Sequence, residues 1–301
     1  MDRCSQFIAD RCTSLIADLV QQSHPNALNR LSFSTSLKYL VLNDPNISVE
    51  ITSPTSFDVY ESQHGLVIAN GPALSQARLS DFFLGSTRVR KQYEAVLKLK
   101  DAGAPTAWLL ISAYYCAFFA CIELCKLLNR VSFGMEDDDL ATLRTKAIGP
   151  FHAQFFAAAP NNFVGVEYAG KLQFRSSGAK PHTAAWDSAQ FALRNLYAPK
   201  AWPDANRLLD LLSDADYSPS RIRNTWNYKR SDYFGSLGEA KGLEFKKLVG
   251  NPEGAAAWLA RGRGRLNAQE PCIIAVLCEA LAAAVIDAAR RGGDLLRQAN
   301  A

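Results

Sequence analysis

Residues 221–234, with the sequence RIRNTWNYKRSDYF, concentrate side chains that bind anions and stack on bases. The segment holds three arginines, two asparagines and four aromatic residues in fourteen positions. A guanidinium presents a planar set of N–H donors to phosphate oxygens, and an aromatic ring packs against a guanidinium or a nucleobase. The composition therefore indicates a site for phosphate or nucleic acid. The alternative is a solvated basic helix, because most runs of charge only cover a surface.

A helix is expected to carry this segment. Ser218 can act as its N-cap and Pro219 as its first residue, where the missing N–H costs nothing. In an α-helix that runs over 218–230, residues four apart share a face. Arg223 then lies beside Asn227, and Asn224 lies beside Tyr228. The predicted face combines a cation with two amides and a phenol.

Composition places the chain among soluble globular proteins. Its 301 residues are 48% hydrophobic and 21% charged, which allows one large domain or two ordinary ones and argues against disorder. The net charge of +4 is small, so affinity for nucleic acid must come from a local patch. The seven cysteines show no CxxC pair and no cysteine–histidine spacing. We therefore expect reduced, buried thiols in a cytoplasmic protein, with no metal site and no cofactor.

Two long apolar runs, at 107–128 and 271–289, approach the length of a membrane span. The first contains Glu123 and Lys126, and the second contains Glu279 and Asp287. Charges at these places favour buried core helices, so we expect no membrane partner. The N-terminal sequence MDRCSQFIADRC is charged and interrupted, which is not the pattern of a signal peptide.

The hydrophobic period predicts a mainly α (α+β) fold with small β elements. Alternation over 47–59 predicts two or three short strands, and 161–175 is typical of a hairpin. Helical periodicity covers the remaining segments, namely 3–22, 86–101, 105–128, 183–197, 203–213, 218–230, 253–262 and 271–297. We expect an N-terminal α/β region of unknown role over residues 1–80. A helical domain over 81–301 then carries an insertion at about 131–182.

Two motifs in this order resemble the HEPN (higher eukaryotes and prokaryotes nucleotide-binding) family of helical-bundle proteins. The first is SAYYCAFFACIELCKLLN at Ser112–Asn129, and the second is the arginine-rich segment that ends in SDYF. Family members often carry a serine–x–tyrosine–tyrosine–alanine–x–phenylalanine helix and, later, an arginine helix near an aspartate–tyrosine pair. The matching residues are Ser112, Tyr114, Tyr115, Phe118, Phe119, Arg223, Asn224, Asp232 and Tyr233. The resemblance implies a divergent HEPN-like bundle, completed by the helices at 86–101 and 271–297.

The resemblance also implies an activity. Many HEPN proteins form homodimers and cut RNA without metal, as toxins or as effectors of antiviral defence. The ribose 2′-hydroxyl attacks the adjacent phosphorus, so the site needs a fixed cation and groups that move protons. For this chain we expect the catalytic residues to be Arg223, Asn224, Asn227 and Tyr228. The residues expected to bind RNA are Arg221, Trp226 and Arg230. The supporting residues are Asp232, Tyr114 and Tyr115. From the residues themselves, we expect Tyr114 and Tyr115 in the core and Asp232 paired with an arginine.

This sequence departs from the family pattern at one position. HEPN ribonucleases carry a histidine a few residues after the arginine, and Asn227 stands roughly at that place. An amide cannot accept and return a proton at neutral pH, and a tyrosine is a poor base. Two functions therefore stay open. One is an RNA-targeting effector, as a metal-independent endoribonuclease or an RNA binder, in bacterial antiviral defence or a toxin–antitoxin pair. The other is a catalytically silent scaffold or sensor that binds a partner protein through its N-terminal α/β region. A protein partner or an antitoxin is possible in either case.

Overall fold

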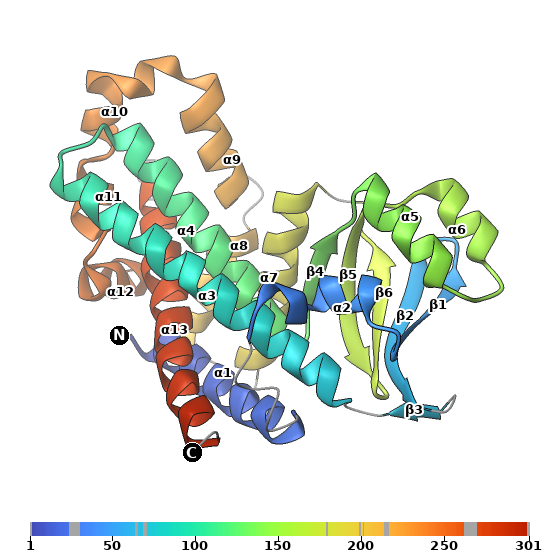
Figure 1. Cartoon of the computed structure of the whole chain (residues 1–301). Coiled ribbons are helices and arrows are strands. Elements are labelled where there is room, and N and C mark those ends of the chain that lie inside the picture. Colours follow the sequence, from blue (N-terminus) through green and yellow to red (C-terminus); the bar gives the residue numbers. More distant parts are fainter. Residues whose placement is uncertain are drawn as a thin grey trace. The chain divides into compact units, whose positions relative to one another are not determined.

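The structure is a computed structural model that describes residues 2–23, 31–63, 66–68, 71–178, 180–198, 200, 202–213, 217–261 and 270–299 (Figure 1). The chain divides into two compact units. Unit 1 contains Met1–Cys12, Gly85–Leu124 and Ala185–Ala289, and unit 2 contains Thr13–Leu84, Cys125–Ala184 and Arg290–Ala301. Five helices contribute residues to both units: α1 (Arg3–Gln22), α3 (Pro72–Asp101), α4 (Thr106–Leu127), α7 (Pro181–Tyr197) and α13 (Glu270–Ala299).

The secondary-structure elements in the described residues of unit 1 are all helices. Its remaining elements are α8 (Pro203–Ser213), α9 (Pro219–Asn224), η3 (Thr225–Lys229), η4 (Ser231–Phe234), α10 (Ser236–Lys241), α11 (Leu243–Leu248) and α12 (Pro252–Ala260). Residues 271–282 of α13 are buried on every side, so this helix runs through the unit's core. A turn connects α3 to α4; in it Gly103 adopts a φ of +67°, and Pro105 precedes the first turn of α4. The two helices are in contact, since the Gln92 side chain on α3 donates to the Ser112 carbonyl on α4.

Helices α4 and α13 are the two apolar runs of the sequence. By length and composition alone, both are long enough to cross a membrane. However, 72% of the most apolar window of α4 and 78% of that of α13 are buried inside the protein. This burial is typical of core helices, as the charged residues within both runs predicted. All seven cysteines are buried, and none of them forms a disulfide.

A buried carboxylate links three parts of the helical core. Glu279 on α13 accepts a hydrogen bond of 2.7 Å from the Tyr93 hydroxyl on α3 and one of 2.7 Å from the Gly250 N–H. Burial raises the pKa of Glu279, while the two hydrogen bonds and the charge of Lys100 oppose the rise. The fold therefore favours the protonated carboxyl more than the unfolded chain does.

Unit 2 contains a six-stranded antiparallel sheet. The strands are β1 (Ile47–Ser53), β2 (Ser56–Gln63), β3 (Leu66–Ile68), β4 (Val131–Gly134), β5 (Asn162–Tyr168) and β6 (Lys171–Ser176). They pair in the order β1-β2-β6-β5-β4, and β3 pairs with β2. The structure thus confirms short strands near the N-terminus and a hairpin in the middle of the chain. The helical elements of this unit are η2 (Phe33–Thr35), α2 (Leu37–Asn43), α5 (Asp137–Lys146) and α6 (His152–Ala158).

The sheet joins two segments that the sequence treated separately. In the pairing of β2 with β6, Phe57 lies opposite Phe174. The strands expected in an insertion at 131–182 therefore complete the sheet that β1 and β2 begin. The strands of the two segments belong to unit 2. Period-2 alternation identifies a strand and its buried face, but it does not identify the strand's partner across more than a hundred residues.

Four phenylalanines form the centre of the unit 2 core. The ring of Phe57 lies 5.0 Å from the rings of Phe163 and Phe174 and 5.8 Å from that of Phe155, between centroids. All four side chains are almost completely buried. Buried residues of α2, α5 and α6 belong to the same cluster, so one hydrophobic core holds these helices and the sheet together.

Replacing Phe57 by alanine should lower the free energy of unfolding by about 3–5 kcal/mol, because it removes the ring that the other three contact. Urea denaturation followed by circular dichroism measures the loss. Leu66→Ala on β3 is the matched control: its side chain is exposed, so it should change stability by less than about 0.5 kcal/mol. Equal losses in the two variants would contradict this description of the core.

Glu279→Gln should change the pH dependence of stability. The raised pKa of Glu279 means that the wild type gains stability from this carboxyl below the ordinary pKa of 4.5, and loses it as pH rises through the higher pKa of the folded state. Glutamine can accept from the Gly250 N–H through Oε1 and donate from Nε2 to the Tyr93 hydroxyl, and it does not ionise. Its stability relative to the wild type should therefore rise as the pH increases above 4.5. Glu94→Gln is the control. The pKa of Glu94 is lowered by its hydrogen bond to Lys91, so any trend should have the opposite sign. A pH-independent difference for Glu279→Gln would refute the shift.

Candidate functional site

Arg223, near the end of α9, presents a positive charge that no carboxylate of the described residues neutralises. Its Nη1 donates to Oδ1 of Asn224 at 2.7 Å, and its Nη2 donates to the hydroxyl of Tyr115 at 2.8 Å. Both acceptors are neutral. Within the described residues no carboxylate lies within 4.0 Å of this guanidinium, and the side chain is half-buried. A cation that is partly removed from water and lacks a counter-ion favours an anionic ligand.

Three tyrosine rings surround the guanidinium. The Cζ atom of Arg223 lies 5.4 Å from the ring centroid of Tyr114, 5.3 Å from that of Tyr115 and 5.5 Å from that of Tyr228. We call Arg223, Asn224, Tyr114, Tyr115 and Tyr228 the Arg223 cluster. Cation–π attraction to the three rings stabilises the charge without cancelling it. Tyr228 is 71% exposed, so the cluster reaches solvent on this side.

Tyr114 anchors the cluster to the core of unit 1. Its ring is completely buried, and its hydroxyl accepts a hydrogen bond of 3.2 Å from Trp186 on α7 and shares one of 3.2 Å with Ser220 on α9. Burial raises the pKa of Tyr114, and the two hydrogen bonds and the nearby Arg223 oppose the rise. The hydroxyl therefore stays neutral and fixes α4, α7 and α9 with respect to one another. Trp186 and Ser220 are contributors that the sequence analysis did not identify, because no local motif marks them.

The helix that carries Arg223 does not continue as the sequence predicted. The α-helix ends at Asn224, and Thr225–Lys229 form a π-helical turn in which the N–H of Arg230 donates to the carbonyl of Thr225 at 3.0 Å. Such turns hydrogen-bond residues five apart rather than four and are frequent at functional sites. The ring of Tyr228, five residues after Arg223, consequently lies against the guanidinium. The α-helical register that would place Asn227 beside Arg223 therefore does not extend over this turn, and the role expected of Asn227 stays a prediction.

Trp226 and Tyr233 hold this turn against the protein. Trp226 is completely buried, lies 4.5 Å from the ring of Tyr233 and donates from Nε1 to Glu270 at 3.3 Å. The expectation that Trp226 binds RNA does not fit this position, because no base can reach a ring that is closed inside the core. An aromatic residue beside arginines is ambiguous in sequence, since stacking on a ligand and packing in a core require the same side chain.

The other two arginines of the segment differ from Arg223. Arg230 forms two hydrogen bonds with Asp232, of 2.9 and 2.6 Å, and the pair is exposed. This contact raises the pKa of Arg230 and lowers that of Asp232. Asp232 thus pairs with an arginine, but with Arg230 rather than with the arginine of the cluster. Arg221 is exposed on α9. Of the predicted site residues, the structure joins Arg223, Asn224, Tyr228, Tyr114 and Tyr115.

No histidine of the described residues belongs to the cluster. His152 and His182 both lie in unit 2, where the His152 ring hydrogen-bonds the carbonyl of Arg144 at 3.1 Å. His24 and His64 lie outside the described residues. The described part of the chain also contains no group of three or more His, Cys, Asp or Glu side chains that could hold a metal. The cluster therefore offers a cation, an amide and phenols, and no group that accepts a proton at neutral pH.

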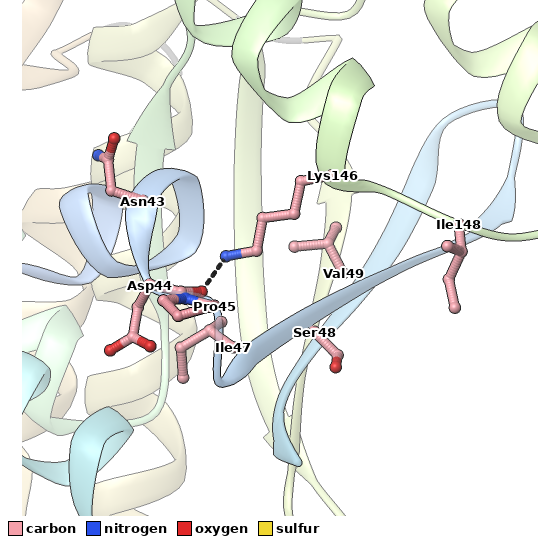
Figure 2. Close-up of a pocket in the computed structure, with 8 residues that line it drawn as sticks. All are labelled: Asn43, Asp44, Pro45, Ile47, Ser48, Val49, Lys146 and Ile148. Carbon is pink, nitrogen blue, oxygen red and sulfur yellow. Dashed lines mark hydrogen bonds between the residues drawn. The ribbon is translucent and has the colours of Figure 1, made fainter. Parts of the chain in front are cut away.

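Unit 2 contains a cavity of about 230 Å³ between the end of α2, strand β1 and the end of α5 (Figure 2). Lys146 points across it toward the backbone of Asp44 (Figure 2). Its Nζ donates to the carbonyls of Val41 at 2.9 Å and Asp44 at 2.5 Å, and burial lowers its pKa. These carbonyls end α2, so the lysine caps a helix. The cavity brings no further cation to its walls, and the Arg223 cluster is the stronger candidate.

Comparisons with protein-family models, curated proteins and solved structures find no match to this chain. The likeness to the HEPN family consequently rests on the residues of α4 and of the segment from α9 to η4. The structure shows a mainly helical protein with a small antiparallel sheet.

Gly238→Ala should disturb the support of the cluster. A Cβ atom at Gly238 on α10 would lie 1.8 Å from the backbone oxygen of Tyr233, so α10 and η4 must move apart. We expect a loss of about 1–3 kcal/mol in the free energy of unfolding, the usual cost of overpacking. Gly235→Ala is the control: its nearest neighbour would be 3.6 Å away, and the change should stay under about 1 kcal/mol. Thermal and urea denaturation compare the two. A neutral Gly238→Ala would show that η4 is not held by this contact.

Proposed function

We propose that this protein binds RNA through a backbone phosphate at Arg223 and acts as a HEPN-like RNA-targeting protein. The observation that carries the proposal is the half-buried guanidinium that neutral groups hold in place and no described carboxylate neutralises. In the same segment, Arg230 is paired with Asp232. A binding site for an anion needs the opposite arrangement, in which the charge stays available.

The guanidinium retains donors for a ligand. Arginine has five N–H donors. Two are used by Asn224 and Tyr115, and the Nε–H is buried without a hydrogen-bond partner in the described residues. One N–H on each Nη atom is therefore left, and the planar fork suits two oxygens of one phosphate.

RNA binding is better supported than RNA cleavage. Attack by a 2′-hydroxyl needs a group that takes its proton, and the cluster contains none that does so at neutral pH. Arg223 can stabilise charge on a phosphate, but Asn224 and Asn227 cannot act as bases. RNA should therefore remain intact during incubation with the pure protein. A homodimer, a cytoplasmic location and a role in antiviral defence or a toxin–antitoxin pair follow from the family resemblance and belong to the proposal.

A second function, a scaffold or sensor for a partner protein, is favoured by one observation in unit 2. Phe33 on η2 is 72% exposed, and its ring lies 6.2 Å from the half-exposed ring of Tyr39 on α2. Aromatic residues on a surface are enriched at protein interfaces. This function requires nothing of Arg223, so the same experiment separates the two.

Arg223→Ala should weaken binding of single-stranded RNA at least tenfold in a fluorescence-anisotropy titration. It should also reduce the salt dependence of binding by about one phosphate contact, because one cation is lost. Arg223→Lys keeps the charge without the fork and should fall between the alanine variant and the wild type.

Arg90→Ala is the matched control for this titration. Arg90 is an exposed arginine of unit 1 on α3, where it pairs with Glu94 at 3.1 Å. Its removal changes the net charge by the same amount and should leave the affinity within about twofold. Equal affinities for the wild type and all three variants would eliminate RNA binding at Arg223 and favour the scaffold.

A further inference from the structure

Helix α4 is buried on all sides except one stripe within unit 1. The accessible residues of α4 in this unit are Trp108, Ser112, Tyr115, Phe119 and Ile122, spaced four, three, four and three apart, and we call them the α4 stripe. This spacing places them on one face of the helix. Tyr115 belongs to the Arg223 cluster, so the stripe leads directly to the guanidinium.

Trp108 is the most exposed residue of the stripe, at 52%. Its ring packs edge-on against Phe234 of η4, with 5.5 Å between centroids and an angle of 72°. The start of α4 is fixed nearby, because the N–H of Thr106 donates to Glu239 on α10 at 2.8 Å. A large aromatic ring is thus held in one orientation while half of its surface contacts water.

The other two rings of the stripe are already covered: Tyr115 packs against the guanidinium of Arg223, and Phe119 packs against that of Arg88. The guanidinium of Arg88 on α3 lies 4.2 Å from the ring centroid of Phe119. Arg88 is held there by Glu123, at 2.9 Å. Trp108 is therefore the ring of the stripe that can accept a ligand. It precedes Tyr115 by seven residues, which is about 10 Å along the helix at 1.5 Å per residue.

We propose that Trp108 stacks a base of a single-stranded RNA whose phosphate binds Arg223, an inference that rests on the proposed RNA binding. Stacking on an aromatic ring is tolerant of sequence and requires a base whose face is open, which a duplex does not offer. The distance along α4 corresponds to about three stacked nucleotides at ~3.4 Å each, or fewer in an extended strand. One strand can therefore reach both groups.

The observations favour a nucleic acid over a second copy of this chain. One exposed ring is far smaller than the roughly 800 Å² that each partner buries in a stable interface. Polar contacts interrupt the stripe at Ser112, where Gln92 donates to the backbone carbonyl at 3.2 Å. Residues 218–248 contain seven Lys or Arg and three Asp or Glu, an excess that attracts a polyanion.

The test uses three labelled ligands of equal length: a single-stranded oligouridylate, an abasic strand with the same phosphates, and a duplex. The full chain should bind the oligouridylate more tightly than the other two. Trp108→Ala should weaken oligouridylate binding about 5- to 100-fold and leave abasic binding unchanged, because only stacking is lost. Trp108→Phe should retain most of the affinity. Phe191→Ala on α7, another exposed aromatic residue of unit 1, is the control and should match the wild type.

A second measurement remains informative if Trp108→Ala folds poorly. Oligouridylate should quench the indole fluorescence of the wild type, and the quenching should be largely lost in Trp108→Phe, which keeps the ring and the fold. The stacking role would be overturned if quenching were unchanged in Trp108→Phe and affinity were unchanged in Trp108→Ala. If Arg223→Ala still bound all three ligands weakly in that case, phosphate binding would remain supported. If neither the Trp108 variants nor Arg223→Ala weakens RNA binding, both the stacking role and the phosphate site are overturned. A change in oligomeric state for Trp108→Ala without a change in RNA affinity would assign the stripe to self-association and also overturn the inference.

Discussion

The Arg223 cluster depends on one physical constraint: a guanidinium is held in place without a carboxylate from the part of the chain that the structure describes. Removing part of a cation from water is costly, and proteins usually offset the cost with an ion pair. Here two neutral hydrogen bonds and three aromatic rings take that role. Each of these partners leaves the net charge in place. The tyrosines of α4 are therefore needed less for their hydroxyl chemistry than for holding a charge that remains available to a ligand.

The π-helical turn explains why buried residues far from solvent matter to this site. Its hydrogen bonds are less regular than those of an α-helix, and it brings Tyr228 to Arg223 at the cost of the expected Asn227 face. The burial of Trp226 and Tyr233 offsets that cost, and the absence of a side chain at Gly238 lets α10 approach η4. Core packing and site geometry are thus one problem in this segment. A larger residue at Gly238 would disturb the packing that holds the π-helical turn, and a change at Tyr228 would remove the contact that this turn makes with Arg223.

Local periodicity predicted the elements well and their long-range relations poorly. The alternation of Ile47, Val49 and Ile51 identified β1, and helical spacing identified α4 and its burial, since each signal lies within a few consecutive residues. The pairing of β2 with β6 is set by residues more than a hundred positions apart, so no local pattern contains it. The π-helical turn was not predicted for a related reason. Tertiary packing places Trp226 in the core, and this packing overrides the α-helical register. The approach of Tyr114 and Tyr115 to Arg223 was anticipated only through the family resemblance.

Counting the basic residues of unit 1 overstates how many of them can bind a phosphate. Arg230 and Arg88 are each paired with a carboxylate, and such charges act on a polyanion mainly through the long-range field. That field is screened beyond about 8 Å at physiological ionic strength, so it guides encounter more than it fixes a complex. A contact at Arg223 is different, because its partners exclude water on one side and leave donors on the other. The difference between paired and unpaired arginines predicts that association with RNA is salt-sensitive, while one arginine and a nearby aromatic ring set the bound geometry. Such behaviour is typical of a protein that binds single strands and not of a general basic surface.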